Sequence, residues 1–269
     1  MGRIDTFRDL GCLVTGASAG IGREIALQLA AQGARLVVTA RRADRLEALV
    51  VELRAAGAPS AEFVIADLVE PESVATIIAA SEAALGHVDV LINNAGFSVP
   101  GLFVRTGLVP TLEMIHVNCG VPVALAHGLL RGMLKRNQGG ILNVSSVAGH
   151  QCAPYQAAYS GTKGFVLNWS NSLHQEVKHT GVSVAALCPG VTDTEFFDVA
   201  GYKNLSGFLN RRMPAEKVAR TGLEALRKGK MEVVPGLANK ALIFSQRFTP
   251  RSFNAAVSRW LMGGRPHPD

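Results

Sequence analysis

Residues 15–22 read TGASAGIG, and they stand between a short apolar run and a stretch in which apolar residues recur at helical spacing. The run CLVTG at 12–16 is typical of a buried strand, and a helix is predicted from Gly20 to about Gln32. Glycines let a backbone turn tightly and approach a pyrophosphate, which the positive end of the following helix attracts. The segment therefore predicts a phosphate site for a dinucleotide, and the alternative is a glycine turn required only for packing. The residues expected at this site are Gly16, Ser18, Gly20, Ile21 and Gly22.

The rest of the chain continues this alternation of short apolar runs and helical stretches. Further strands are expected at 36–40, 63–67, 88–93, 141–146, 182–189 and 231–235. Further helices are expected at 43–56, 71–86, 107–136, 155–179 and 214–227. Strands that are apolar on both faces and alternate with helices form parallel sheets covered on each side. We therefore expect a Rossmann-type, doubly wound parallel α/β sheet of about seven strands with helices on both faces, in a single domain spanning 1–269.

Composition narrows the possible partners. Apolar residues make up 48% of the chain and charged residues 18%, which indicates a compact globular protein. The net charge of +6 favours anionic partners such as phosphate-bearing cofactors, acyl thioesters or an anionic membrane surface. Lysines and arginines are scattered, so we expect no nucleic acid partner. No apolar run reaches the ~20 residues that span a bilayer, and the charged start is unlike a signal peptide.

The spacing of the cysteines and histidines indicates a protein of a reducing compartment that has no metal site. None of the four cysteines forms a CxxC pair, and the seven histidines show no metal-ligand spacing. Free buried thiols are typical of cytosolic proteins. We therefore expect a cytoplasmic protein without a metal site. The cysteines are Cys12, Cys119, Cys152 and Cys188.

Two arginines follow the second strand. In dinucleotide folds this strand end faces the adenosine ribose, where an acidic residue selects NAD and a basic residue accommodates the 2′-phosphate of NADP. Here the strand ends in Arg41 and Arg42, with no Asp or Glu at the turn. Guanidinium groups pair with phosphate bidentately, so NADPH or NADP+ is predicted and NADH is less favoured. The alternative is that both arginines begin a solvated helix.

Tyr159 and Lys163 stand four residues apart on a predicted helix, so they project from the same face. A phenol ionises near pH ~10, and a nearby ammonium favours the phenolate and lowers that value. The pair thus predicts an acid and base that exchanges a proton near neutral pH. A tyrosine and a lysine on a helix surface are common by chance, so the context decides the interpretation.

The glycine spacing, the order of the motifs and the YxxxK pair resemble the short-chain dehydrogenase/reductase family over about residues 10–235. The resemblance implies that Ser146 binds the substrate carbonyl oxygen and that Asn118 holds a water linking Lys163 to solvent. It also implies that Lys163 binds the nicotinamide ribose and that Tyr159 is the catalytic acid. The cofactor-binding residues carried over from the family motifs are Asp67, Asn94, Ala95, Gly96, Tyr159, Lys163, Pro189, Gly190, Thr192 and Thr194.

The resemblance also divides the chain by role. Residues 10–189 form the expected cofactor-binding and catalytic core, and 190–213 the expected substrate lid, whose Phe and Tyr residues suggest an apolar substrate body. Residues 236–269 form a C-terminal extension that carries arginines and aromatics. This extension could complete the core, contact a second copy, lie on a lipid surface or bind an anionic acyl carrier.

The expected activity is hydride transfer between NADPH and a ketone or aldehyde, with a 3-oxoacyl or steroid-like substrate, and its reversal as alcohol oxidation. A sugar-nucleotide epimerase or dehydratase is disfavoured by the glycine spacing. A non-catalytic NADP(H)-binding regulator is the remaining alternative, although it would not need the intact catalytic set. By analogy with the family, a homodimer or homotetramer is expected through the helices at 107–136 and 155–179.

Overall fold

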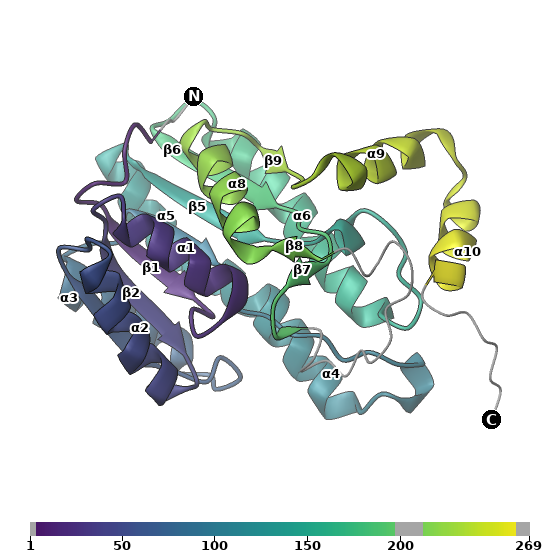
Figure 1. The fold of residues 1–269 in the computed structure, drawn as a ribbon, viewed down its shortest axis with the longest axis horizontal. Coiled ribbons are helices and arrows are strands. Elements are labelled where there is room, and N and C mark those ends of the chain that lie inside the picture. The colour runs from purple at the N-terminus through teal and green to yellow at the C-terminus, as the bar shows by residue number, and fades with distance from the viewer. Residues whose placement is uncertain (1–3, 197–211, 262–269) are drawn as a thin grey trace.

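The computed structural model describes residues 4–196 and 212–261, and its centre is one parallel sheet (Figure 1). The order of the strands across the sheet is β3-β2-β1-β4-β5-β6-β9, and every neighbouring pair is parallel. The strand order reverses between β1 and β4, which is where doubly wound sheets open a crevice for ligands. The predicted Rossmann-type fold is confirmed. The strands are β1 (Gly11–Thr15), β2 (Arg35–Ala40), β3 (Ala61–Ile65), β4 (Val90–Asn93), β5 (Gly139–Val144), β6 (Val182–Leu187) and β9 (Glu232–Val233).

Helices cover both faces of this sheet. On one face, α1 (Gly20–Ala30), α2 (Ala43–Ala55) and α8 (Ala215–Arg227) share a buried core with the strands. On the other face, α3 (Ser73–Leu85), α5 (Val121–Arg136) and α6 (Ala157–Val177) share a second core. The two cores are separated by the sheet itself, because successive strand residues point to opposite faces.

The strand bounds differ from the sequence prediction by one or two residues, and two of the differences bear on the site. The third strand was expected at 63–67 but runs from Ala61 to Ile65, because its partner β2 ends at Ala40 opposite Ile65. The fifth was expected at 141–146 but begins at Gly139, paired with Val182, and ends at Val144. Ser145 and Ser146 therefore lie just beyond the sheet, where their side chains are available to the site.

The helix expected at 107–136 is interrupted by a wider turn. It consists of α4 (Leu108–Ile115), a π-helical turn η2 (His116–Gly120) and α5. By length and composition alone, the continuous segment Leu108–Arg136 could cross a membrane, with a mean hydropathy of 1.4 and 39% of the scored window buried. The sequence expectation concerned uninterrupted apolar runs, whereas this segment reaches its mean hydropathy with polar residues interspersed. The apolar face of α5 packs against the sheet.

The segments after β6 surround the carboxyl end of the sheet. A small two-stranded sheet joins β7 (Thr192–Asp193) to β8 (Met213–Pro214). The C-terminal extension forms α9 (Leu237–Ser245), η5 (Gln246–Phe248) and α10 (Arg251–Leu261), so it is helical on both sides of Pro250. Short 3-10 turns lie at η1 (Phe103–Arg105) and η3 (Val147–Gly149). Most of the expected lid, 197–211, lies outside the described residues.

Candidate active site

The glycine turn has the geometry of a phosphate cradle. Gly16 has a φ of +65°, and a Cβ there would lie 2.8 Å from the Cα of Ala95. A Cβ on Gly22 would lie 2.5 Å from the carbonyl oxygen of Gly16. No side chain caps α1 at Ala19, and its first turn holds no acidic residue. The first amides of α1 therefore present an uncapped positive helix end, which suits a pyrophosphate.

Thr15 joins β1 to β4 at the point where the strand order reverses. Its hydroxyl donates to the carbonyl oxygen of Ile92 at 3.1 Å and accepts from the backbone N–H groups of Asn94 and Ala95 at 3.0 and 3.1 Å. The Asn94 amide donates to the carbonyl oxygens of Thr15 and Gly16 at 2.9 and 3.1 Å. Asn94 and Ala95 thus hold the glycine turn against β4. The role of Thr15 was not predicted from the sequence.

Arginines line the far end of the crevice, beyond β2. Arg42 donates to the Ser18 hydroxyl from Nε at 3.3 Å and from Nη2 at 3.0 Å, which links the strand end to the glycine turn. Arg41 is 72% exposed at its side chain and lies 3.9 Å from the Asp67 carboxylate. The other oxygen of Asp67 accepts from the backbone of Val69 at 3.1 Å. Arg41, Arg42, Ser18 and Asp67 therefore gather at one end of the crevice.

A carboxylate from the start of the expected lid completes this end. Glu195 lies 2.9 Å from Nη1 of Arg42 and 2.6 Å from Nη1 of Arg45. Hydrogen bonds from Arg42 and Arg45 hold the pKa of Glu195 below its usual value. Sequence reasoning missed both Arg45 and Glu195. The two guanidinium groups therefore share one carboxylate, and charge-assisted pairing of this kind is also how arginines bind phosphate.

Tyr159 and Lys163 lie on α6, the helix on which their spacing placed them, and both side chains are buried. The Lys163 ammonium lies 5.8 Å from the centroid of the Tyr159 ring and donates to the carbonyl oxygen of Val144 at 2.9 Å. Burial lowers the pKa of Lys163 from 10.5 to about 8. Phe196 contacts the Tyr159 ring at a centroid distance of 5.7 Å. Phe196, from the segment expected to form the lid, therefore places an aromatic ring against Tyr159.

Asn118 occupies the π turn η2 and is 1% exposed. Its carbonyl oxygen accepts from the backbone of Phe97 at 3.1 Å, and its amide donates to Phe97 at 3.0 Å and to Thr162 at 3.1 Å. A Cβ on Gly96 would lie 2.8 Å from Oδ1 of Asn118 and 3.5 Å from Nζ of Lys163. Gly96, Asn118 and Lys163 therefore meet at one point. π turns of this kind often lie at functional sites.

Two neighbouring serines at the end of β5 have different partners. Ser145 is buried and donates to the carbonyl oxygen of Lys163 at 2.7 Å, so it fixes α6 against the sheet. Ser146 accepts from the backbone of Ala148 at 3.1 Å and lies 3.5 Å from the carbonyl oxygen of Pro189. As a donor, the Ser146 hydroxyl makes only the long 3.5 Å contact with the carbonyl oxygen of Pro189. It is therefore better placed than Ser145 to donate to a ligand oxygen.

The segment after β6 crosses over the glycine turn. A Cβ on Gly20 would lie 2.8 Å from the Thr194 methyl group, so Thr194 lies directly over the phosphate cradle. The Thr192 hydroxyl is buried and donates to the carbonyl oxygen of Gly190 at 3.0 Å. Thr194 thus has the more direct contact with the cradle, and Thr192 stabilises the turn.

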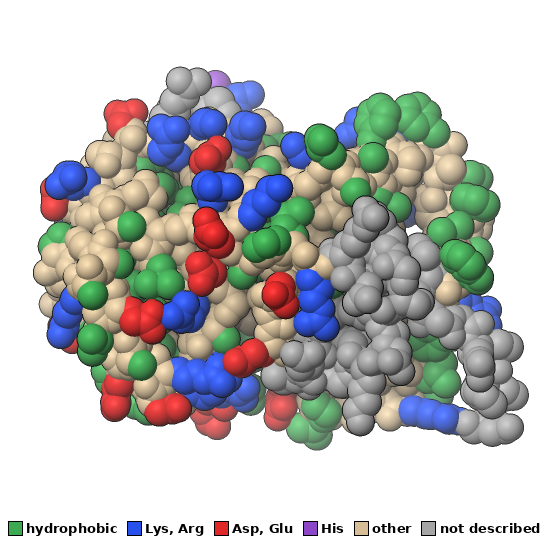
Figure 2. Space-filling view, viewed as in Figure 1, with side chains coloured by type: hydrophobic (Ala, Val, Ile, Leu, Met, Phe, Trp, Pro, Cys, Tyr) green, Lys and Arg blue, Asp and Glu red, His purple; other side chains and the backbone are tan. Residues whose placement is uncertain are grey.

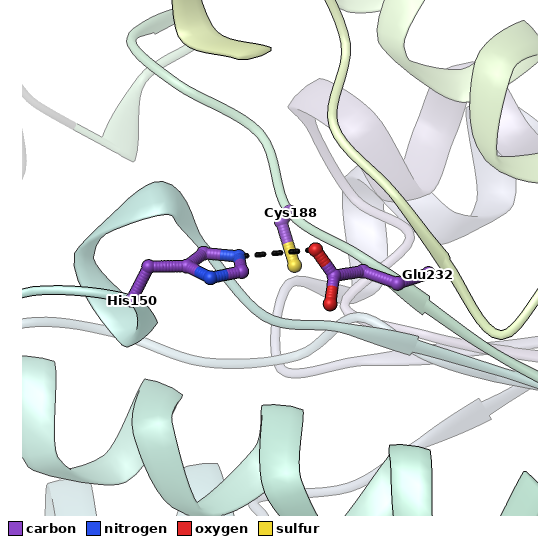
Figure 3. A group of neighbouring side chains, drawn as sticks. All are labelled: His150, Cys188 and Glu232. Carbon is purple, nitrogen blue, oxygen red and sulfur yellow. Dashed lines mark ion pairs between the residues drawn. The ribbon is translucent and has the colours of Figure 1, made fainter. Parts of the chain in front are cut away.

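A second cluster of polar side chains lies behind the Ser146 loop. His150 lies 3.3 Å from the Glu232 carboxylate, and the Cys188 sulfur lies beside this pair (Figure 3). Their ligand atoms all lie within 4.8 Å of one another, close enough to hold a metal ion. Burial raises the pKa of Cys188, whereas the His150 contact lowers that of Glu232. The cluster thus combines a buried thiol with an imidazole–carboxylate contact, and the expected absence of a metal site stays a prediction.

The comparisons with known proteins agree with this geometry. Residues 11–203 match the family model described as short chain dehydrogenase. The chain belongs to the short-chain dehydrogenase family. Dehydrogenase/reductase SDR family member 7B of Bos taurus is 34% identical over 238 residues, which cover 84% of this chain and 73% of that protein. The 3-oxoacyl-acyl-carrier-protein reductase of Escherichia coli is 32% identical over 206 residues, covering 77% of this chain and 82% of the relative.

Solved structures of short-chain dehydrogenases share the fold over nearly the whole chain. A Sphingobium yanoikuyae enzyme in complex with NADPH has a TM-score of 0.79 and 28% identity, covering 96% of each chain. A Burkholderia phymatum enzyme in complex with NAD has a TM-score of 0.82 and 23% identity, covering 91% of this chain and 95% of that one. The two neighbours hold different nicotinamide cofactors. The family is therefore established, and cofactor choice depends on this chain's own residues.

Proposed function

We propose that this short-chain dehydrogenase is an NADPH-dependent carbonyl reductase that also catalyses the reverse alcohol oxidation. The convergence of Lys163, Asn118 and Gly96 behind Tyr159 is the observation that supports it best. A bound nicotinamide cofactor would supply or accept the hydride. The buried, pre-positioned polar groups of this chain then handle the proton and the charge on the substrate oxygen.

Tyr159 donates the proton to the substrate oxygen in this proposal. The Lys163 ammonium favours the phenolate that remains, which lowers the cost of losing that proton. The Ser146 hydroxyl donates a hydrogen bond to the same oxygen as negative charge develops there. Asn118 fixes the backbone of Phe97 beside Lys163 and keeps the π turn in place, so it borders the path by which the proton would be replaced.

NADPH is the proposed cofactor because the adenosine end is cationic. Arg41 and Arg42 directly follow β2, and Arg45 lies one turn further along the chain. A 2′-phosphate bound here would replace Glu195 as the partner of Arg42 and Arg45. The residues proposed to hold the rest of the cofactor are Gly16, Ser18, Gly20, Ile21, Gly22, Asp67, Asn94, Ala95, Gly96, Tyr159, Lys163, Pro189, Gly190, Thr192 and Thr194.

The proposed substrate is a ketone or aldehyde with an apolar body, such as a 3-oxoacyl thioester or a steroid-like ketone. Phe196 beside Tyr159 supports an apolar wall, and one relative is named as a 3-oxoacyl reductase. We further propose a homo-oligomer formed through α4 to α6. Exposed Leu108 and Val109 on α4 and exposed Phe165, stacked on Trp169 of α6, support such a contact.

Turnover measurements test the proposal. NADPH and NADH oxidation are followed with a panel of ketones, aldehydes and 3-oxoacyl thioesters, using the wild type and Tyr159→Phe. We expect turnover with NADPH that the variant loses. Tight NADPH binding with no turnover on any substrate would favour a regulator instead, and binding of neither cofactor would refute the assignment.

A further inference from the structure

The last helices form an arm that is attached to the rest of the protein near the loop that follows Ser146. We call residues 237–261 the C-terminal arm, which comprises α9, η5 and α10 and extends away from the sheet (Figure 1). Ile243 of the arm and Val147, the residue after Ser146, pack against the same small core. Gln246 of the arm hydrogen bonds to Gln151 of the loop that follows Ser146. The base of the arm is therefore part of the folded body.

The outer face of the arm is apolar. Phe253, Val257 and Trp260 are spaced by four and three residues on α10, so they form one exposed stripe. Ser258 of the same helix is 7% exposed. A surface helix normally buries its apolar stripe. In α10 this stripe is exposed together with Arg251 and Arg259, while Ser258 is buried.

The apolar face continues onto α9 and η5. The exposed fractions of its large apolar side chains range from 37% for Val257 to 83% for Leu237. Figure 2 shows hydrophobic side chains gathered along the outer edge of the molecule over α9 and α10. An exposed apolar surface of this size marks a contact with another molecule or a membrane. Its large exposed side chains are Leu237, Phe244, Phe248, Phe253, Val257 and Trp260.

The charge of the arm is positive throughout. Residues 236–261 contain four basic residues and no Asp or Glu, whereas the whole chain has 27 basic and 21 acidic residues. All four basic side chains are exposed, and the Arg247 guanidinium lies 5.9 Å from the Phe244 ring. Basic residues interspersed with exposed aromatics are typical of helices that lie in a membrane interface. The four are Lys240, Arg247, Arg251 and Arg259.

We propose that the outer face of the C-terminal arm docks on the surface of an anionic lipid bilayer. The apolar stripe would enter the headgroup region, and the basic residues would pair with lipid phosphates. A second copy fits less well, because a symmetric contact would bring two sets of four cations together without an acidic partner. Where the proposed function holds, the Ser146 loop would lie near a bilayer that dissolves apolar ketones.

Vesicle binding of the full chain tests this proposal without substrate or cofactor, so its outcome is independent of the proposed function. The probe is phosphatidylcholine vesicles with and without about one third phosphatidylglycerol, with binding measured by sedimentation at low and high salt. We expect partitioning at least about tenfold stronger with the anionic lipid and weakened by salt.

Matched variants locate the contact. Phe253→Ser with Trp260→Ser, and separately Arg251→Glu with Arg259→Glu, should each reduce partitioning about tenfold or more. The control Lys217→Glu with Arg220→Glu places the same charge change on exposed residues of α8 and should change it less than about twofold. Circular dichroism checks that each variant is folded.

A fluorescence measurement supplies a second readout. The chain has two tryptophans, so Trp169→Phe leaves Trp260 as the reporter, and its emission should shift to the blue on anionic vesicles. Absence of vesicle binding, or binding that the arm variants do not affect, overturns the proposal. Self-association that the arm variants abolish, without vesicle binding, overturns it in favour of a second copy.

Discussion

The two ends of the crevice use charge in opposite ways. At the adenosine end, Arg41, Arg42 and Arg45 reach a solvent-facing region and share carboxylates. At the catalytic end, Lys163 is 5% exposed and is held by backbone oxygen, with neutral polar groups around it. Exposed ion pairs are screened and can exchange partners at little cost. Buried groups cannot, so the first end suits ligand selection and the second suits chemistry.

This comparison predicts that a substitution at the catalytic end lowers activity more than one at the adenosine end. Tyr159→Phe removes one hydroxyl and should lower kcat by about 10³-fold, the range expected for loss of a general acid. Cofactor affinity, measured by fluorescence titration, should change far less. Equal losses in kcat and in cofactor binding would show that Tyr159 mainly maintains the fold of the site.

Lys163→Met tests whether the buried lysine at the catalytic end lowers the free energy of unfolding. Burial lowers the folded pKa of Lys163 from 10.5 to about 8, so the unfolded chain holds this proton more tightly. The free energy of unfolding of the wild type should therefore rise as the pH increases from about 8 to about 10.5. At pH 7 removal of this buried charge should make the variant more stable by roughly 3 kcal/mol, and activity should be lost.

Denaturant unfolding at two pH values measures this effect. The stability gain of Lys163→Met should shrink as the pH rises, because the wild-type lysine is then already neutral in the folded state. Lys228→Met provides the control, since Lys228 is exposed and pairs with Glu224 on the surface. A variant that is less stable than the wild type at pH 7 would contradict the prediction.

At the adenosine end, the expected effects are smaller and specific to the phosphate. Arg42→Ala removes the contacts with Ser18 and Glu195 and should weaken NADPH binding about tenfold, with little change for NADH. Isothermal titration with both cofactors measures the ratio. Arg54→Ala is the matched control, because Arg54 lies near the far end of α2, the helix that Arg42 precedes, and contacts Glu62 instead. An equal loss of affinity for NADH would contradict the proposal that Arg42 binds the 2′-phosphate.

Glu195→Gln should have the smallest effect and the opposite sign. The carboxylate competes with a 2′-phosphate for Arg42 and Arg45, so its neutralisation should strengthen NADPH binding about threefold. NADH binding should not change. The control Asp193→Asn alters a carboxylate two residues away that faces Arg212. Weaker NADPH binding in Glu195→Gln would mean that the carboxylate supports the bound state.

Sequence alone predicted the catalytic end better than the adenosine end. The four-residue spacing of Tyr159 and Lys163 and the strand ends at Asn94 and Ser146 are local signals that the backbone converts directly into position. The pairing of Glu195 with Arg42 joins residues 153 positions apart, and no local pattern marks it. The π turn around Asn118 was equally hidden, because its residues fit an ordinary helix pattern. The exposure of the apolar stripe on α10 becomes visible only when the burial of each residue is known.

Thr15 has a consequence for how tightly this crevice can bind. One buried hydroxyl makes three hydrogen bonds that tie the ends of β1 and β4 together, so the width of the crevice at its centre is set before any ligand arrives. Little conformational entropy then remains to be lost there on binding. The entropy cost of ordering falls instead on the exposed arginine side chains at the adenosine end, where the additional phosphate of NADPH would offset it.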